Sequence, residues 1–175
     1  MNTNELNFEQ ELYSAISGLS LWGEGKATTT EAGVLFQAEN ISAVEEFNAM
    51  GRVSLDVREE TKRSVEFLTI DLVLAQNADP KLADKIIPKL YDVNLALKEG
   101  VFYLDDSNNL CYEVNFPVLR ADLEASLKLF IAAYTDVMNY IDGVYPFLLR
   151  VMSHPDDSSF NEYIMAILES GEEQA

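Results

Sequence analysis

The sequence contains only one cysteine and one histidine among its 175 residues. One cysteine cannot form an intramolecular disulfide, so nothing indicates an oxidising compartment. One histidine cannot supply a multi-histidine metal site. The two scarcities therefore exclude a disulfide scaffold and the metal centres that depend on several histidines.

Long hydrophobic runs are also missing. A membrane-spanning helix needs about 20 mainly apolar residues, and Asp71, Asp142 and Arg150 interrupt the best candidate stretches. The polar N-terminal stretch MNTNELNFEQ lacks the basic and apolar regions of a secretory signal. We therefore expect a cytoplasmic protein that has no membrane partner.

Positive charge is scarce, since 12 basic residues face 30 acidic ones and the net charge is −18. Eight of the 12 basic residues lie within residues 51–98, which leaves both ends of the chain acidic. Such a field repels phosphate backbones and anionic lipids, so we expect no nucleic-acid partner. It would attract basic or amphipathic peptides, although a solvated acidic surface that keeps a protein soluble is the commoner meaning of such charge.

Motifs for chemistry are incomplete. In SLWGEGKA, Ser20 and Ala27 replace residues that a phosphate-binding loop requires. Cys111 shares a strand face with Glu113, which disfavours a thiolate, and His154 has no predicted nucleophile or metal partner. We therefore predict no enzyme activity, no cofactor and no metal site, although an active site built from acidic residues stays open.

The acidic stretch DDSNN, residues 105–109, has two competing interpretations. As a calcium loop that starts at Asp105, it would place Leu110 where glycine is needed and Phe116 where glutamate is needed. As a turn, it has the right length and residue types to join two β-rich runs. A hairpin turn is the better prediction.

Apolar periodicity predicts the other elements. Spacings of three and four predict helices, and alternation predicts strands. Asp79 and Pro80 suit a helix start, Pro88 should kink or divide that helix near Ile87, and Gly100 should end it. Helices are predicted at 8–19, 79–100, 122–152 and 160–168, with a weaker turn or two at 42–50; strands at 32–40, 52–59, 65–75, 101–104 and 110–116; and a loop at 23–30.

This order predicts an α+β fold in which a twisted antiparallel sheet packs against helices. We expect one domain over residues 1–175. Its helix–sheet–helix–hairpin core would span 8–118, C-terminal helices would span 121–169, and residues 170–175 would form a frayed tail.

The segment LYDVNLALKEGVFYLDDSNNLCYEVNFPV, residues 90–118, resembles the YbjN family of sensory transduction regulators, within the type III secretion chaperone-like fold. The likeness rests on Asn94, Leu97, Gly100, Phe102, Leu104, Asp105 and Pro117. The chain departs from the family pattern at residues 141–175, which are longer and more aromatic. The resemblance implies that fold and a homodimer that binds extended client segments. The long C-terminal helical extension that we also predict is this chain's own departure from the family pattern.

Two functions follow as hypotheses. The first is a non-enzymatic, chaperone-like or regulatory module that binds an extended or amphipathic protein segment through apolar contacts and strand addition. Its candidate partner surface is Phe67, Val73, Tyr134, Tyr140, Tyr145 and Phe147. Helix core is the commoner role for the four aromatic residues at 134–147. The alternative function is a small-ligand sensor with a pocket between the sheet and the long helix.

Overall fold

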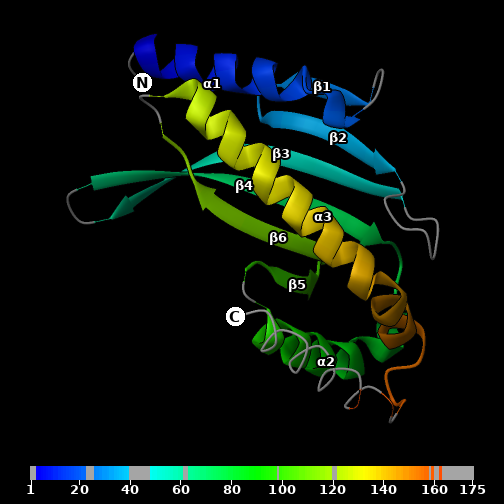
Figure 1. The fold of residues 1–175 in the computed structure, drawn as a ribbon. Coiled ribbons are helices and arrows are strands. Elements are labelled where there is room, and N and C mark those ends of the chain that lie inside the picture. The colour runs from blue at the N-terminus through cyan, green and yellow to red at the C-terminus, as the bar shows by residue number, and fades with distance from the viewer. Residues whose placement is uncertain are drawn as a thin grey trace.

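The computed structural model describes residues 3–22, 26–39, 48–60, 63–97, 99–119, 122–157, 159 and 162. Within these residues the chain forms a six-stranded antiparallel sheet and three α-helices. Figure 1 shows the longest helix lying obliquely across the sheet. The predicted α+β class, with a long C-terminal helix, is confirmed.

The sheet has the strand order β1-β2-β3-β4-β6-β5, so every strand except β5 and β6 lies in chain order. The long strands β3 and β4 form the centre, and β1 and β5 form the two edges. The strands are β1 Ala27–Thr30, β2 Gly33–Glu39, β3 Asn48–Glu60, β4 Arg63–Ala75, β5 Val101–Leu104 and β6 Leu110–Pro117.

The helices are α1 Thr3–Ser17, α2 Ala83–Ala96 and α3 Leu123–Ser153, with two short 3₁₀ turns, η1 Ser20–Trp22 and η2 Pro80–Leu82. Helices α1 and α3 lie on the same side of the sheet, and α2 lies beside the edge strand β5 (Figure 1). Within the residues that the structure describes, no helix therefore covers the opposite face of the sheet.

The core forms between this sheet and the helices because strand side chains alternate between two faces. Leu68, Ile70 and Leu72 of β4 are almost fully buried on the helix side. From α3, Phe130 and Leu148 are fully buried against them. Asp122 caps the start of α3 by accepting a hydrogen bond from the Ala125 amide at 2.9 Å.

An aromatic cluster joins η1, β2 and α3. Trp22 lies 4.3 Å from Phe36 and 4.9 Å from Tyr134, measured between ring centroids. The Trp22 indole donates a 2.7 Å hydrogen bond to the Ile16 carbonyl, which ties η1 to α1. Phe36 lies over Gly51 of β3, where a Cβ atom would collide with its ring. Residues far apart in sequence therefore pack as one unit at this end of the core.

Two local predictions were wrong. Residues 27–30, within the predicted loop 23–30, form β1, and Asn48–Met50, within the predicted helical turns 42–50, begin β3. The rest of those turns lies outside the described residues. β1 forms because Glu31 and Ala32 make a two-residue turn that pairs it with β2.

Helix α2 also differs from its prediction at Pro88 and at its end. Asp79 accepts a hydrogen bond from the Lys81 amide, as expected of a helix cap. The element that it caps is the 3₁₀ turn η2, which precedes α2. α2 passes through Pro88 without a break and ends at Ala96, four residues before Gly100. Gly100 has a φ of 76° and lies against the Tyr112 ring, so it serves the turn into β5.

The C-terminal part is described only in part. Helix α3 confirms the predicted helix at 122–152, whereas the predicted helix at 160–168 and the tail at 170–175 lie outside the described residues, apart from residue 162. Among the residues that the structure describes, no helix combines the length and apolarity that a membrane crossing requires.

Candidate functional site

The candidate site is the sheet face that points away from α1 and α3, here called the open face. Strand pairing places its side chains in rows, because directly paired residues point to the same side. On β2 and β3, Leu35 and Met50 are 46% and 55% exposed, whereas their neighbours Val34 and Ala49 are fully buried on the helix side. The open face is therefore an accessible, partly apolar surface.

An apolar row crosses four strands of this face. Met50 pairs with Val73, Val73 pairs with Cys111, and Cys111 pairs with Tyr103. With neighbouring strands about 4.8 Å apart, the four positions span about 14 Å. Met50 is exposed, Val73 and Tyr103 are partly buried and Cys111 is buried, so the row is accessible mainly at its Met50 end. Strand positions on the wet side of a sheet are usually polar, so an apolar row there calls for an explanation.

A charged row lies next to the apolar row. Arg52 of β3 lies directly opposite Asp71 of β4, and its guanidinium forms a 2.8 Å ion pair with the Asp71 carboxylate. Asp71 in turn lies directly opposite Glu113 of β6. Glu113 accepts a 3.0 Å hydrogen bond from Asn115, which leaves its charge uncompensated. Arg52 thus neutralises Asp71 alone, and Glu113 gives the row a net negative charge.

Phe67 and Val73, two of the predicted partner-surface residues, both lie on the open face. Both side chains are partly buried. Val73 occupies an inner position of the apolar row. Phe67 pairs with Asp56 and Pro117 and lies on the other side of the charged row, four residues before Asp71 on β4. The prediction from β4, whose two sides are both apolar, therefore identified an accessible face.

The predicted surface residues on α3 require correction. Tyr134, Tyr145 and Phe147 are buried with at most 9% of each side chain exposed, and Tyr140 is partly buried against the core. The Tyr145 hydroxyl donates a 3.3 Å hydrogen bond to the Leu74 carbonyl, and the Tyr140 ring lies 6.4 Å from that of Phe102. These aromatic residues hold α3 on the sheet and do not form an accessible surface.

The two edges of the sheet are protected to different degrees. At β5, the Asn94 side chain donates to the Phe102 carbonyl and accepts from its amide, both at 2.8 Å. Asn94 therefore occupies the groups that an added strand would use. At β1, the Gln37 amide bonds to the Lys26 carbonyl, so the alternate residues Ala27 and Thr29 direct their backbone groups outward.

The acidic stretch 105–109 is the turn of the β5–β6 hairpin, as predicted. Asp105 accepts hydrogen bonds from the amides of Ser107 and Asn109 at 2.9 and 2.8 Å, and Asn108 has a φ of 58°. Its bonds to Asn109 and Ser107 hold the Asp105 pKa below its ordinary value. The carboxylate oxygens thus stabilise the turn.

The two residues that were weighed for catalysis lie on different elements. Cys111 is 4% exposed on β6, and burial, assisted by the charge of Asp105, raises its pKa to about 11. His154 is the C-cap of α3 and lies 3.0 Å from the Ser153 hydroxyl through Nδ1. No group of three or more histidine, cysteine or acidic residues able to hold a metal ion occurs in the described ranges.

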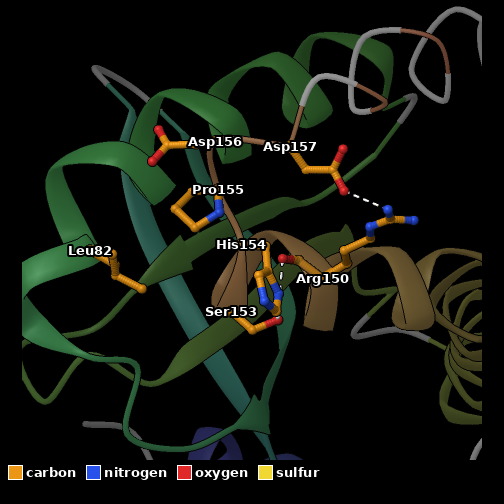
Figure 2. Close-up of a pocket in the computed structure, with 7 residues that line it drawn as sticks. All are labelled: Leu82, Arg150, Ser153, His154, Pro155, Asp156 and Asp157. Carbon is orange, nitrogen blue, oxygen red and sulfur yellow. Dashed lines mark hydrogen bonds and ion pairs between the residues drawn. The ribbon is translucent and has the colours of Figure 1, made fainter.

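A pocket of about 510 Å³ lies at the C-terminal end of α3, lined by Leu82, Arg150, Ser153, His154, Pro155, Asp156 and Asp157. Figure 2 shows Arg150 and Asp157 pointing toward one another, in an ion pair of 2.5 Å. Asp156 is paired in the same way with Lys85. Arg150 and Lys85 are therefore both neutralised by carboxylates. The pocket lies away from the predicted ligand position, which was between the sheet and the long helix.

Met50, Cys111 and Tyr103 belong to the apolar row but were not predicted as site residues. Their relationship depends on strand register, which the sequence does not show. The nearest signal was the alternation of β3 and β6. Comparisons of the chain with family models, curated proteins and solved structures found no match. The resemblance to the YbjN family stays a prediction.

Proposed function

We propose that the protein is a non-enzymatic interaction module that binds a partner protein on the open face. The observation that carries the proposal is the apolar row beside exposed Met50 and Leu35, on the face opposite the helical layer. Exposed, contiguous apolar surface commonly marks an interaction site. Met50, at one end of the row, would be a main contact because it is the most exposed side chain of the row.

The chemistry of the face favours a partner segment that carries both apolar and basic side chains. Apolar groups would cover the row, and a cation would approach the uncompensated charge of Glu113 beside Asp71. The net charge of −18 would speed the encounter with a basic partner. An extended segment could also pair with the outward groups of β1, whereas Asn94 protects β5.

A non-enzymatic role and a cytoplasmic location form part of this proposal. The raised pKa of Cys111 keeps its thiol protonated near neutral pH, which supports a packing role for this side chain. A chain with one buried cysteine is also suited to a reducing compartment. Chaperone-like binding of an extended client is the form of this function that the sequence resemblance suggests.

A small-ligand sensor remains the second candidate function, supported by the pocket at the end of α3. Leu82 and Pro155 offer apolar contacts there, and His154 offers a polar one (Figure 2). A thermal-shift screen of metabolites tests it, because a ligand that binds the folded state raises the melting temperature with its concentration. A ligand whose effect survives a His154→Ala or Leu82→Ala substitution would bind elsewhere.

The open-face proposal is tested by comparing Met50→Lys with a control variant, Leu129→Lys. Leu129 is 45% exposed on α3, so the two substitutions add the same charge at sites of similar exposure. Each protein is used to capture partners from lysate of its own cells, and the bound proteins are quantified by mass spectrometry. Met50→Lys should lose the partner by at least about tenfold, because it removes an apolar contact and repels cations.

Circular dichroism and thermal unfolding establish that both variants are folded. Partners captured equally by wild type, Met50→Lys and Leu129→Lys would contradict binding through the open face. Loss of the partner with Leu129→Lys alone would move the site to α3. A partner that is lost only with Met50→Lys can then be measured directly with purified protein.

A further inference from the structure

The pocket at the end of α3 carries an arrangement of charges that narrows the class of ligand it fits. Its volume is about 510 Å³, and small-molecule sites typically measure about 300–1,000 Å³. Its walls come from η2, from the last turn of α3 and from residues 154–157 that follow this helix. We call it the α3-end pocket. Three chain segments thus meet around a space that is large enough for a small metabolite.

A tight turn after α3 forms one wall of this pocket. The His154 amide donates a 2.7 Å hydrogen bond to the Arg150 carbonyl, and the Asp157 amide donates a 3.1 Å hydrogen bond to the His154 carbonyl. The second bond closes a four-residue turn that reverses the chain. Asp157 therefore comes back to meet the guanidinium of Arg150, seven residues before it.

The carboxylate of Asp157 is held in place from two sides. Its Oδ1 atom accepts hydrogen bonds from the Ser159 amide and hydroxyl at 3.0 and 2.9 Å, and its Oδ2 atom pairs with Arg150. These bonds to Ser159, assisted by Arg150, hold the Asp157 pKa below its ordinary value. The side chain is 26% exposed. Asp157 is therefore a fixed negative charge that a ligand can still reach.

Arg150 offers the complementary positive charge. Its side chain is 60% exposed, and its ion pair with Asp157 runs through one terminal nitrogen. A guanidinium group has five N–H donors in a planar fork, so a further carboxylate could accept from its other donors. The pocket thus presents a positive and a negative group side by side.

The charges around the pocket are balanced, and this balance selects the ligand. Arg150 pairs with Asp157, and Lys85 of α2 pairs with Asp156. A ligand with a net charge would leave one charge uncompensated where it displaces water, which is costly. A zwitterion avoids this cost because it brings one charge of each sign. Its carboxylate can face Arg150 while its ammonium group faces Asp157, so that opposite charges alternate.

The spacing of the two charges favours an α-amino acid among zwitterions. The ion pair joins Arg150 Nη2 and Asp157 Oδ2 at 2.5 Å. The ammonium and carboxylate groups of an α-amino acid are attached to one Cα atom through bonds of about 1.5 Å, so they lie similarly close together. Figure 2 shows Leu82 and Pro155 on the opposite side of His154 from this ion pair. A large apolar side chain would extend toward them.

We propose that the α3-end pocket binds a free α-amino acid with a large apolar side chain, whose carboxylate pairs with Arg150 and whose ammonium group pairs with Asp157. The proposal deepens the second candidate function, the small-ligand sensor, and rests on it. It uses no residue of the open face, so it does not depend on a partner protein there.

Four compounds test the parts of the ligand separately. Phenylalanine carries both charges and a large apolar side chain, glycine lacks the side chain, N-acetylphenylalanine lacks the ammonium group, and phenylalanine amide lacks the carboxylate. Each is titrated into the purified protein to millimolar concentration, and the melting temperature and the heat of binding are measured. Phenylalanine should raise the melting temperature saturably. The other three should bind at least about tenfold more weakly, because each lacks one set of contacts.

Two variants test the pocket with phenylalanine as the probe. Arg150→Gln removes the positive charge, and Asp157→Asn removes the negative charge while it keeps an oxygen that can accept from Ser159. Both should bind phenylalanine at least about tenfold more weakly than the wild type. Lys128→Gln is the matched control, because it also breaks an exposed ion pair on α3, with Glu124 at 2.6 Å. It should bind like the wild type, and circular dichroism establishes that all three variants are folded.

Phenylalanine that leaves the melting temperature unchanged would overturn the inference. So would a blocked analogue that binds as tightly as phenylalanine, or Arg150→Gln and Asp157→Asn proteins that bind as tightly as Lys128→Gln. A failure of the sensor function itself looks different. If a compound of another class raises the melting temperature and loses this effect in Leu82→Ala, the pocket binds a ligand and the amino-acid class is wrong. If no compound does so, both proposals fail.

Discussion

Asn94 illustrates how one side chain can determine which edge of a sheet is available. Its amide group pairs with both backbone groups of Phe102, as another strand would, and so ends the sheet at β5. A side chain that closes an edge in this way opposes unwanted pairing with other chains. At the other edge, Ala27 and Thr29 of β1 direct their backbone groups away from β2, and the Thr29 hydroxyl donates a 3.0 Å hydrogen bond to the Ser17 hydroxyl of α1.

Replacing Asn94 should reveal the cost of leaving that edge open. Asn94→Ala leaves the Phe102 amide and carbonyl without partners in a partly buried place, so we expect a loss of about 2 kcal/mol in the free energy of unfolding. Urea unfolding followed by circular dichroism measures it. Asp92→Ala, at an exposed position of the same helix, should change stability by less than about 0.5 kcal/mol.

The same variant should also associate more readily, because β5 then presents free hydrogen-bonding groups. Light scattering during mild heating would detect this change. An Asn94→Ala protein as stable as Asp92→Ala would show that the two hydrogen bonds contribute little, and that the packing of Leu90 and Val93 alone holds α2 on the sheet.

At the scale of elements, glycine packing connects β2 to β3. The Phe36 ring occupies the space above Gly51, so a methyl group there would force the ring out of the aromatic cluster around Trp22. At Gly143, in α3, an added Cβ atom would meet open space. The two glycines therefore predict opposite effects for the same substitution.

Gly51→Ala should destabilise the protein by about 1–3 kcal/mol, because overpacking forces side chains and backbone to shift. Gly143→Ala should stabilise it by about 0.5–1 kcal/mol, because alanine favours the helical backbone. Thermal and urea unfolding of both variants, with Trp22 fluorescence as a probe of the cluster, give the comparison. Equal effects of the two substitutions would mean that the Phe36 ring can move aside without lowering the free energy of unfolding.

Much of this architecture could be predicted from local patterns. Alternation at residues 52–59 and 65–75 located β3 and β4, and the three-and-four spacing after Asp122 located α3. β1 was missed because four residues after a glycine-rich stretch carry little periodic signal, and their strand forms through pairing with β2. Pro88 did not divide α2, because burial of Ile86 and Leu90 around it favours a continuous helix.

The site was less predictable for a related reason. Phe67 and Val73 could be found because β4 is apolar on both sides. Strand register, which joins Val73 to Met50 and Cys111, is a long-range property that no local pattern contains. Tyr145 and Phe147 were misplaced because the second half of α3 is buried on more than one side, so periodicity alone did not separate core from surface.

At the scale of the whole molecule, charge selects among possible partners of the open face. The net charge of −18 acts on every encounter, and the charged row adds a local negative charge at Glu113 beside the ion pair of Arg52 and Asp71. An acidic partner is repelled at long range, whereas a basic partner is attracted at long range and also near Glu113.

Salt should therefore weaken the binding of a basic partner to the open face. The screening length shortens from about 30 Å at 0.01 M to about 10 Å at 0.1 M salt. Over this range the dissociation constant should rise at least a few-fold, because the long-range attraction between the two proteins is screened.

Titration of the captured partner into the wild type at both salt concentrations measures this effect. Leu129→Lys, which leaves the open face unchanged, is the control and should show the same salt dependence. A partner whose affinity stays constant or rises with salt would show that apolar contacts, and not the charge of the chain, bring it to the open face.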